Sequence, residues 1–214
     1  MKFITKNVFF YFIIGLFSSL ILQSCNKSTS ENSQQTNQDS NQITAQDSTE
    51  LTKIVRQTYT WVETTEQKAD FEPTQEKPTD TIYSGLDLTI QKARIEQLEK
   101  SGFFANQFIE NYKQIATKTD EKLKNGSAVW AVGDLPPFVG SGINAWCNCQ
   151  DYPEKYWEKI TLSKFEKQSG ETAFVWTLDN GFIYKVRAKK ENEVWKISYL
   201  EGFDEKNYEV EVIE

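Results

Sequence analysis

The hydrophobic pattern changes its period at Ile160, and this change limits the possible folds more than any other feature of the sequence. Before Ile160, apolar residues recur every three to four positions, and after it they alternate with polar ones. The alternation predicts four strands, over 160–167, 172–178, 182–189 and 194–201. In the third strand, one face carries Phe182, Tyr184, Val186 and Ala188, and the other carries Lys185, Arg187 and Lys189. A strand of this kind has one apolar face to cover and one that meets water.

Three helices are predicted upstream of the strands. The first runs over 49–66 with Ser48 as its N-cap, the second from Asp87 or Thr89 to Lys100, and the third over 103–124. A polar, proline-containing connection fills 67–84. Since only these helices can cover the apolar face of an antiparallel sheet, we predict an α+β fold of N-terminal helices packed on a curled, antiparallel four-stranded meander.

The meander is expected to have an aromatic inner face. The neighbouring strands contribute Phe174, Trp176 and Leu178, and Trp195, Ile197 and Tyr199. The chain has helices followed by such a meander, which ends in Glu193-Val194-Trp195-Lys196-Ile197. Over residues 48–203 this arrangement resembles the nuclear-transport-factor-2-like (cystatin-like) superfamily. The stretch Cys149-Gln150-Asp151-Tyr152-Pro153 adds to the likeness to bacterial secreted proteins and lipoproteins of that superfamily. The resemblance implies a cone-shaped cavity, which members use to bind ligands or to catalyse reactions, or which side chains fill.

The N-terminus has the pattern of an export signal. Lys2 and Lys6 precede an apolar run over 8–22, which is shorter than the ~20 residues that span a bilayer. Leu22-Gln23-Ser24-Cys25 then resembles the lipobox of bacterial lipoproteins, which implies cleavage before Cys25 and a lipid anchor on its sulfur. The alternative is an ordinary signal peptide followed by a chance cysteine.

The chain is therefore divided into a lipoprotein signal peptide (1–24), a disordered tether (25–46) and a single α+β domain (47–214). The tether is rich in Ser, Thr, Asn and Gln, and it has too few apolar residues to offset the entropy of ordering. By resemblance, the expected location is the outer membrane, facing the periplasm.

Composition excludes several classes of function. Removal of residues 1–24 takes away two lysines and no acidic residue, so the net charge of −7 becomes −9 and nucleic acid is not an expected partner. Histidine is absent from all 214 residues, which removes histidine-activated nucleophiles, histidine acid/base catalysis and most zinc or iron sites. No cofactor and no metal site are predicted.

The segment 126–156 is the most unusual part of the domain, because it combines glycine and proline with tryptophan. A loop of this kind either forms a lid over a cavity or packs into the core as a plug, and we favour the plug. It contains Cys147 and Cys149. A structural pair, as a disulfide or as buried thiols, is favoured over a redox pair and over a metal-binding pair.

Candidate pocket residues come from this loop and from the aromatic face of the sheet. They are Trp130, Asp134, Asp151, Tyr152, Trp176, Tyr184 and Trp195. The carboxylates and tyrosines could perform acid/base chemistry in an apolar cone, but turn-capping aspartates and core aromatics are the more common roles of such residues.

The sequence contains no complete catalytic set, so we predict a membrane-anchored, extracytoplasmic binding or interaction domain. Its partner would be an envelope protein or a small apolar or sugar ligand, besides the membrane that holds its lipid. One alternative is a carboxylate/tyrosine-based enzyme in the cone, and another is a lipoprotein inhibitor or immunity protein.

Overall fold

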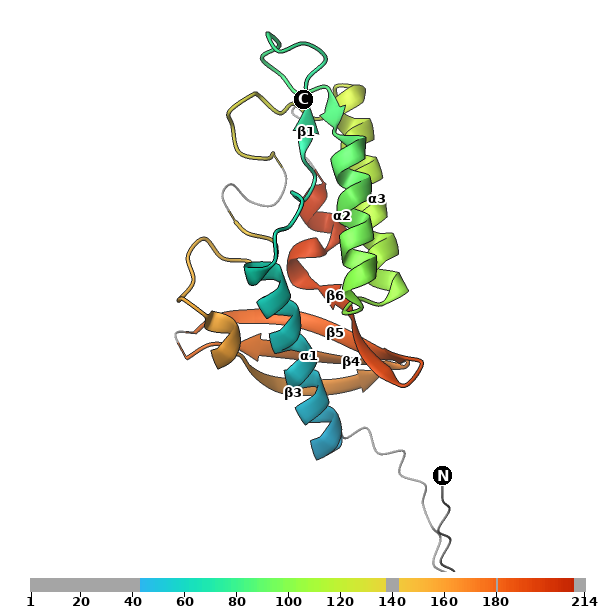
Figure 1. Ribbon diagram of the computed structural model, residues 1–214, viewed down its shortest axis with the longest axis vertical. Coiled ribbons are helices and arrows are strands. Elements are labelled where there is room, and N and C mark those ends of the chain that lie inside the picture. Colours follow the sequence, from blue (N-terminus) through green and yellow to red (C-terminus); the bar gives the residue numbers. More distant parts are fainter. Residues whose placement is uncertain (1–42, 138–142, 180, 210–214) are drawn as a thin grey trace, which may run out of the picture. The chain divides into compact units, whose positions relative to one another are not determined.

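The computed structural model describes residues 43–137, 143–179 and 181–209. Three helices precede a four-stranded antiparallel sheet, as Figure 1 shows. The four strands lie side by side in their chain order, and the curled sheet does not close on itself. The α+β prediction is confirmed. Cys25, the signal peptide and most of the tether lie outside the described residues.

The helices begin and end where side chains or glycine satisfy the backbone. Helix α1 (Ala45–Thr64) starts four residues earlier than predicted, because the Thr44 hydroxyl rather than Ser48 accepts the N-terminal N–H group, from Asp47. In α2 (Leu88–Ser101), the Asp87 carboxylate, one of the two predicted caps, accepts from the N-terminal N–H groups, and Gly102 ends the helix at φ 73°. Helix α3 (Asn106–Lys124) has a stripe of buried side chains from Phe108 to Leu123.

The sheet closely follows the predicted strands. They are β3 (Thr161–Gln168), β4 (Glu171–Thr177), β5 (Ile183–Glu191) and β6 (Val194–Leu200). Tyr184, Val186 and Ala188 face inward and are buried, while Lys185 and Arg187 are exposed.

One prediction for the inner face is wrong. A register shift between β5 and β6 places both Ile197 and Ser198 in the interior, so Tyr199 pairs with Arg187 on the outer face. The Arg187 guanidinium lies 4.3 Å from the centre of the Tyr199 ring. A bulge of this kind cannot be read from alternation, because one inserted residue reverses the faces of all that follow.

The connection between α1 and α2 contains structure that the sequence did not predict. Strands β1 (Pro73–Thr74) and β2 (Gly85–Leu86) pair antiparallel, and Ile82 forms an isolated bridge with Ala131. The residues 103–105, expected to be helical, are instead extended. They bond to β6 through Ala105 N to Ile197 O at 2.8 Å and Ile197 N to Phe103 O at 2.8 Å.

Two helices cover the inner face of the sheet. Helix α1 lies against it and contacts β3 and β6, while α3 packs on β6 and runs beside α2 (Figure 1). The buried stripe of α1 consists of Leu51, Ile54, Val55, Thr58 and Tyr59. The core is thus formed between helices and sheet, with Trp176 and Tyr184 completely buried in it.

Over the described residues, no helix combines the length and the apolar character that a bilayer-spanning segment requires.

Candidate functional site

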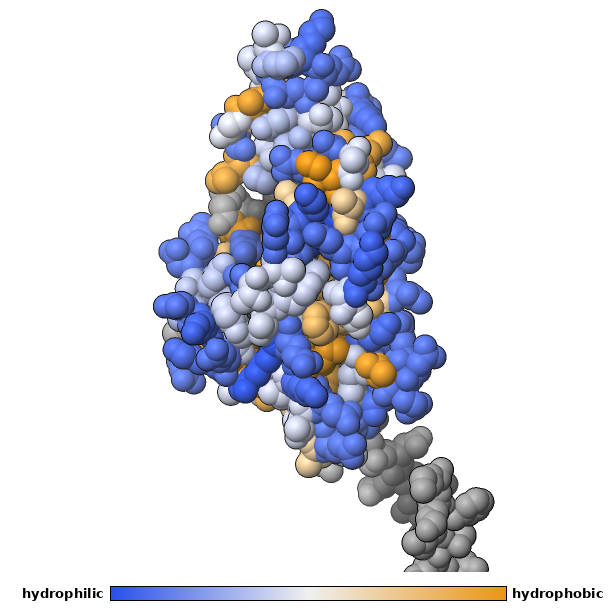
Figure 2. Space-filling view, in the orientation of Figure 1, coloured by the Kyte–Doolittle hydropathy of each residue, from blue (hydrophilic) through white to orange (hydrophobic). Residues whose placement is uncertain are grey.

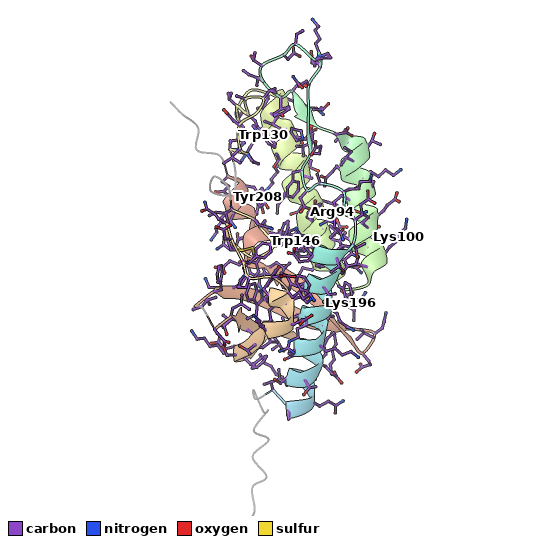
Figure 3. All side chains as sticks on the ribbon, turned by 60° about the vertical axis from the view of Figure 1, so that its left-hand side comes forward. Arg94, Lys100, Trp130, Trp146, Lys196 and Tyr208 are labelled. Atoms are coloured by element: carbon purple, nitrogen blue, oxygen red, sulfur yellow. A yellow bond between two sulfur atoms is a disulfide. The ribbon has the colours of Figure 1, made fainter. Side chains whose placement is uncertain are left out.

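A short loop, residues 143–149, occupies the interior between the helices and the sheet. Trp146 is 5% exposed, Cys147 2% and Cys149 5%, and all three belong to the hydrophobic core. Figure 3 shows Trp146 in the middle of the domain, near Arg94 of α2. We call residues 143–149 the plug, because this part of the 126–156 segment fills space instead of covering it; residues 138–142 lie outside the described part.

The plug is held in a tight turn by its own backbone. The carbonyl oxygen of Asn144 accepts from Asn148 N at 2.7 Å, and its side-chain oxygen accepts from Trp146 N at 2.9 Å. Cys147 and Cys149 form a disulfide across the turn. Asn148 lies between them at φ 52°, in the left-handed region that asparagine tolerates better than most residues.

Two tyrosines fix the plug to the rest of the core. The Tyr59 hydroxyl donates to the Trp146 carbonyl at 2.6 Å and accepts from Trp176 Nε1 at 3.0 Å. The Tyr184 hydroxyl donates to the Ala145 carbonyl at 2.6 Å and accepts from Gly202 N at 2.8 Å. Burial raises the pKa of both phenols well above its usual value, so both act as fixed hydroxyl groups at neutral pH.

Gly202 provides the space for this arrangement. It follows β6 in a short 3-10 turn, η2 (Glu201–Phe203), and packs directly on the plug backbone. A Cβ atom at Gly202 would lie 1.8 Å from the Ala145 carbonyl oxygen. Only glycine therefore allows the chain after β6 to approach the plug this closely.

A cluster around the partly buried Asp70 carboxylate holds the other side of the plug. Asp70 accepts from Arg94 Nε, Tyr112 OH and Trp146 Nε1, each at 2.7 Å. Arg94 is 1% exposed and also donates to Gln67. Its guanidinium lies 5.3 Å from the Trp146 ring centre and 5.6 Å from that of Trp61. One carboxylate thus connects the α1–α2 connection, α2, α3 and the plug.

Of the predicted pocket residues, Trp176 and Tyr184 lie together in this core, with ring centres 5.4 Å apart. Neither has solvent exposure. Their buried polar atoms are engaged by Tyr59, Ala145 and Gly202. In this structure they support the plug.

Trp195 has a different position, because it lines two hollows at the surface. One, of about 420 Å³, lies between the start of α1, the β3–β4 turn and the end of β5; the other, of about 360 Å³, lies between α1, the α2–α3 link and the β5–β6 turn. Beside Trp195, Lys190 Nζ is 3.0 Å from the Asp47 carboxylate and 5.0 Å from the indole centre. The Lys190 amine lowers the pKa of Asp47.

The remaining predicted residues do not join these two places. Trp130 is buried against Tyr83, at 5.1 Å between ring centres, and donates to the Asp134 backbone carbonyl at 3.0 Å. The Asp134 and Asp151 side chains are exposed. Tyr152 is 37% exposed, and its hydroxyl donates to Glu63 at 3.1 Å.

Sequence reasoning missed the residues that organise these clusters. Glu63 accepts from both Tyr152 and Tyr156, the latter at 2.9 Å, yet it lies on a polar position of a predicted helix. Asp70 and Arg94 likewise appear as ordinary charged residues of a connection and a helix. The only signal was the position of Arg94 within the apolar period of α2, between Ile90 and Leu98.

Within the described ranges, no group of three or more cysteine and acidic residues is arranged to hold a metal ion. The disulfide occupies both sulfur atoms of the plug.

Comparisons with protein-family models, with curated proteins and with solved structures found no match to this chain. A function must therefore be argued from the geometry of its own residues.

Proposed function

We propose that this chain is an exported, lipid-anchored domain that binds a ligand at its surface and does not catalyse a reaction in its interior. The observation that carries the proposal is the plug. It fills the space between α1 and the sheet, and its backbone accepts hydrogen bonds from the Tyr59 and Tyr184 hydroxyls, which are then not available for chemistry in the cone. Binding is then assigned to the hollows on either side of Trp195.

The chemistry of these hollows fits a small ligand that has hydroxyl groups and an apolar face, such as a sugar. The hollow beside the β5–β6 turn has apolar walls from Ile54, Phe103 and Val194, and Figure 2 shows apolar side chains at the surface between α1 and this turn. The other hollow is lined by Lys167, Gln168 and Glu171, which can exchange hydrogen bonds with hydroxyl groups.

Glu171 gives a reason to expect a polar ligand in the hollow that it lines together with Lys167 and Gln168. Its Oε1 atom is buried without a hydrogen-bond partner among the described residues, while Oε2 lies 3.8 Å from Arg187 Nη1. A buried acceptor without a partner is uncommon in folded proteins. A ligand hydroxyl or a water molecule would satisfy it.

Thermal unfolding in the presence of free hexoses and N-acetylhexosamines tests the binding site. A sugar at tenfold excess over its Kd stabilises the folded state by about 1.4 kcal/mol, which raises the Tm by roughly 3–6 °C. Val194→Glu places a charge at the hollow and should abolish the rise. Ile183→Glu is the matched control, because Ile183 is as exposed as Val194, both at 57%, but lies at the other end of the β5–β6 hairpin.

Two outcomes would contradict the ligand class or the site. The class is wrong if no sugar of the panel changes the Tm of the unsubstituted protein. Binding at the hollow beside the β5–β6 turn is contradicted if the Val194→Glu and Ile183→Glu variants both keep the full rise.

Cell fractionation tests the anchor. The proposal rests on the lipobox-like Leu22-Gln23-Ser24-Cys25, and it predicts that fed palmitate labels the protein and that the protein sediments with envelopes. Cys25→Ala should remove the label. A Cys25→Ala protein that is processed to its mature length and still sediments with envelopes would contradict the lipid anchor.

A second candidate, a carboxylate/tyrosine enzyme, is favoured by the cluster of Glu63, Tyr152 and Tyr156. Burial, followed by the neighbouring charge of Glu63, raises the pKa of Tyr152, so this phenol stays protonated and can act as an acid but not as a base at neutral pH. If the protein hydrolyses a substrate ester or glycoside, Glu63→Gln should abolish turnover, whereas Glu158→Gln, at an exposed carboxylate two residues after Tyr156, should not.

A further inference from the structure

We propose that the Cys147–Cys149 disulfide is a redox latch, so that its reduction to two thiols releases the plug and opens the interior between α1 and the sheet. This inference goes beyond the proposed function and does not depend on it. It concerns the space that the plug fills, whereas ligand binding is assigned to the surface beside Trp195.

The latch follows from the volume available to the two sulfur atoms. Both cysteines are at least nine-tenths buried, in a core that contains Trp146, Phe203 and Tyr184. Bonded sulfur atoms lie about 2 Å apart, whereas two unbonded heavy atoms require roughly 3.5–4 Å. Protein interiors are close-packed and accept little extra volume. Reduction therefore pushes the turn outward, because its surroundings cannot expand.

The bond is suited to control a local conformation. Only Asn148 separates the two cysteines, and the loop-closure contribution of a disulfide to global stability is least for so short a loop. The bond instead fixes the turn in which Asn144 N donates to Cys149 O at 2.9 Å. Its loss should thus loosen the plug while the sheet stays folded.

Movement of the plug would be transmitted to the core through three named contacts. The Trp146 indole would leave Asp70, the Trp146 carbonyl would leave Tyr59, and the Ala145 carbonyl would leave Tyr184. The space vacated would be bordered by Tyr59, Trp176 and Tyr184, an aromatic surface with hydroxyl and indole groups that the plug no longer engages.

The reductant is a small-molecule dithiol, which reaches the buried sulfur atoms through local opening of the plug. A thiolate of the dithiol attacks one cysteine sulfur, the Cys147–Cys149 bond breaks, and the other cysteine leaves as a thiolate that takes up a proton. The second thiolate of the dithiol then attacks the mixed disulfide and releases the first cysteine. Two electrons and two protons pass to the protein, and the dithiol becomes a disulfide.

Hydrogen exchange of the full chain before and after dithiothreitol treatment tests the latch, with alkylation at Cys147 and Cys149 read by mass spectrometry to confirm reduction. We expect amides in 143–149 to exchange at least tenfold faster after reduction, while β4 and β5 keep their protection. Unchanged exchange in 143–149 after complete reduction would overturn the latch. Loss of protection throughout the sheet would overturn it as well, because the bond would then support the whole fold.

A variant that lacks both sulfurs provides the control. The Cys147→Ala, Cys149→Ala double variant removes the bond without adding volume, so it should fold and show no response to dithiothreitol. The Cys147→Ser, Cys149→Ser variant has an unbonded oxygen atom in place of each sulfur, and it should show the fast exchange of the reduced protein without reductant. Slow exchange in this serine variant would count against the volume argument.

Discussion

The protein contains two clusters of the same composition, an aspartate, a cation and a tryptophan, which differ in the burial of the cation. In the interior, Asp70 lies 2.7 Å from Arg94, whose guanidinium is 5.3 Å from the Trp146 ring centre. At the surface, Asp47 lies 3.0 Å from Lys190, whose amine is 5.0 Å from the Trp195 ring centre. The side chain of Arg94 is 1% exposed and that of Lys190 is 38% exposed, whereas Asp70 at 24% and Asp47 at 15% are both partly buried.

The difference between the clusters is the number of chain segments that each carboxylate holds. Asp70 accepts three hydrogen bonds, from α2, α3 and the plug, and its removal leaves a buried guanidinium without a counterion. Lys190 can turn toward water when Asp47 is absent. The same three residue types therefore join segments of the core around Asp70 and border a surface hollow around Asp47.

Asp70→Asn should have the largest effect. The asparagine keeps the shape but loses the charge, and its NH₂ group would oppose the N–H of either Trp146 or Arg94. We expect a loss of about 3–5 kcal/mol in the free energy of unfolding, measured by urea denaturation. Asp134→Asn, at an exposed carboxylate, should change stability by less than ~0.5 kcal/mol. Equal losses of stability in the Asp70→Asn and Asp134→Asn variants would contradict the structural role assigned to the Asp70 cluster.

Gly202→Ala should follow, because the new methyl group would overlap the Ala145 carbonyl. Because the clash is between backbone segments, no side chain can move to relieve it. We expect a loss of about 3 kcal/mol in the free energy of unfolding, at the upper end of the values for overpacked sites. Hydrogen exchange should locate the change in the plug and in η2. An unaltered plug would mean that the chain after β6 can move away at little cost.

Tyr59→Phe should have an intermediate effect on stability. It leaves the Trp146 carbonyl and the Trp176 indole N–H without their buried partner, which costs about 2 kcal/mol. Tyr83→Phe is the control, since Tyr83 is half-buried outside the plug contacts. If Tyr59→Phe leaves the free energy of unfolding unchanged, a water molecule takes the place of the hydroxyl.

Asp47→Asn should have the smallest effect, below ~1 kcal/mol at neutral pH. The Lys190 amine lowers the folded-state pKa of Asp47, so the contribution of the pair is present above the ordinary carboxylate pKa and is lost as the pH falls through the lower, folded value. The difference from the unsubstituted protein should disappear in an acid unfolding series once the pH falls below the lowered, folded-state pKa of Asp47. A difference that grows as the pH falls would contradict this assignment.

The sequence allowed the sheet to be predicted more accurately than the sites. Four strands and the Asp87 cap follow from local patterns, because alternation and capping depend on residues close in sequence. The face of the sheet on which Tyr199 lies could not be predicted from the local pattern, because the bulge depends on how β6 pairs with β5. The clusters around Asp70 and Glu63 join residues far apart in the chain, and nothing in their local sequence marks them.

By itself, the sequence determined the succession of helices and strands, the lipobox-like pattern at Cys25 and the absence of histidine chemistry. The tertiary structure alone decided that residues 143–149 enter the core, that Gly202 makes room for them, and that Asp70 pairs with a buried cation while Asp47 pairs with an exposed one. The physical reason is that hydrophobic period and caps are local properties, whereas close packing and the desolvation of a charge depend on which distant segments meet.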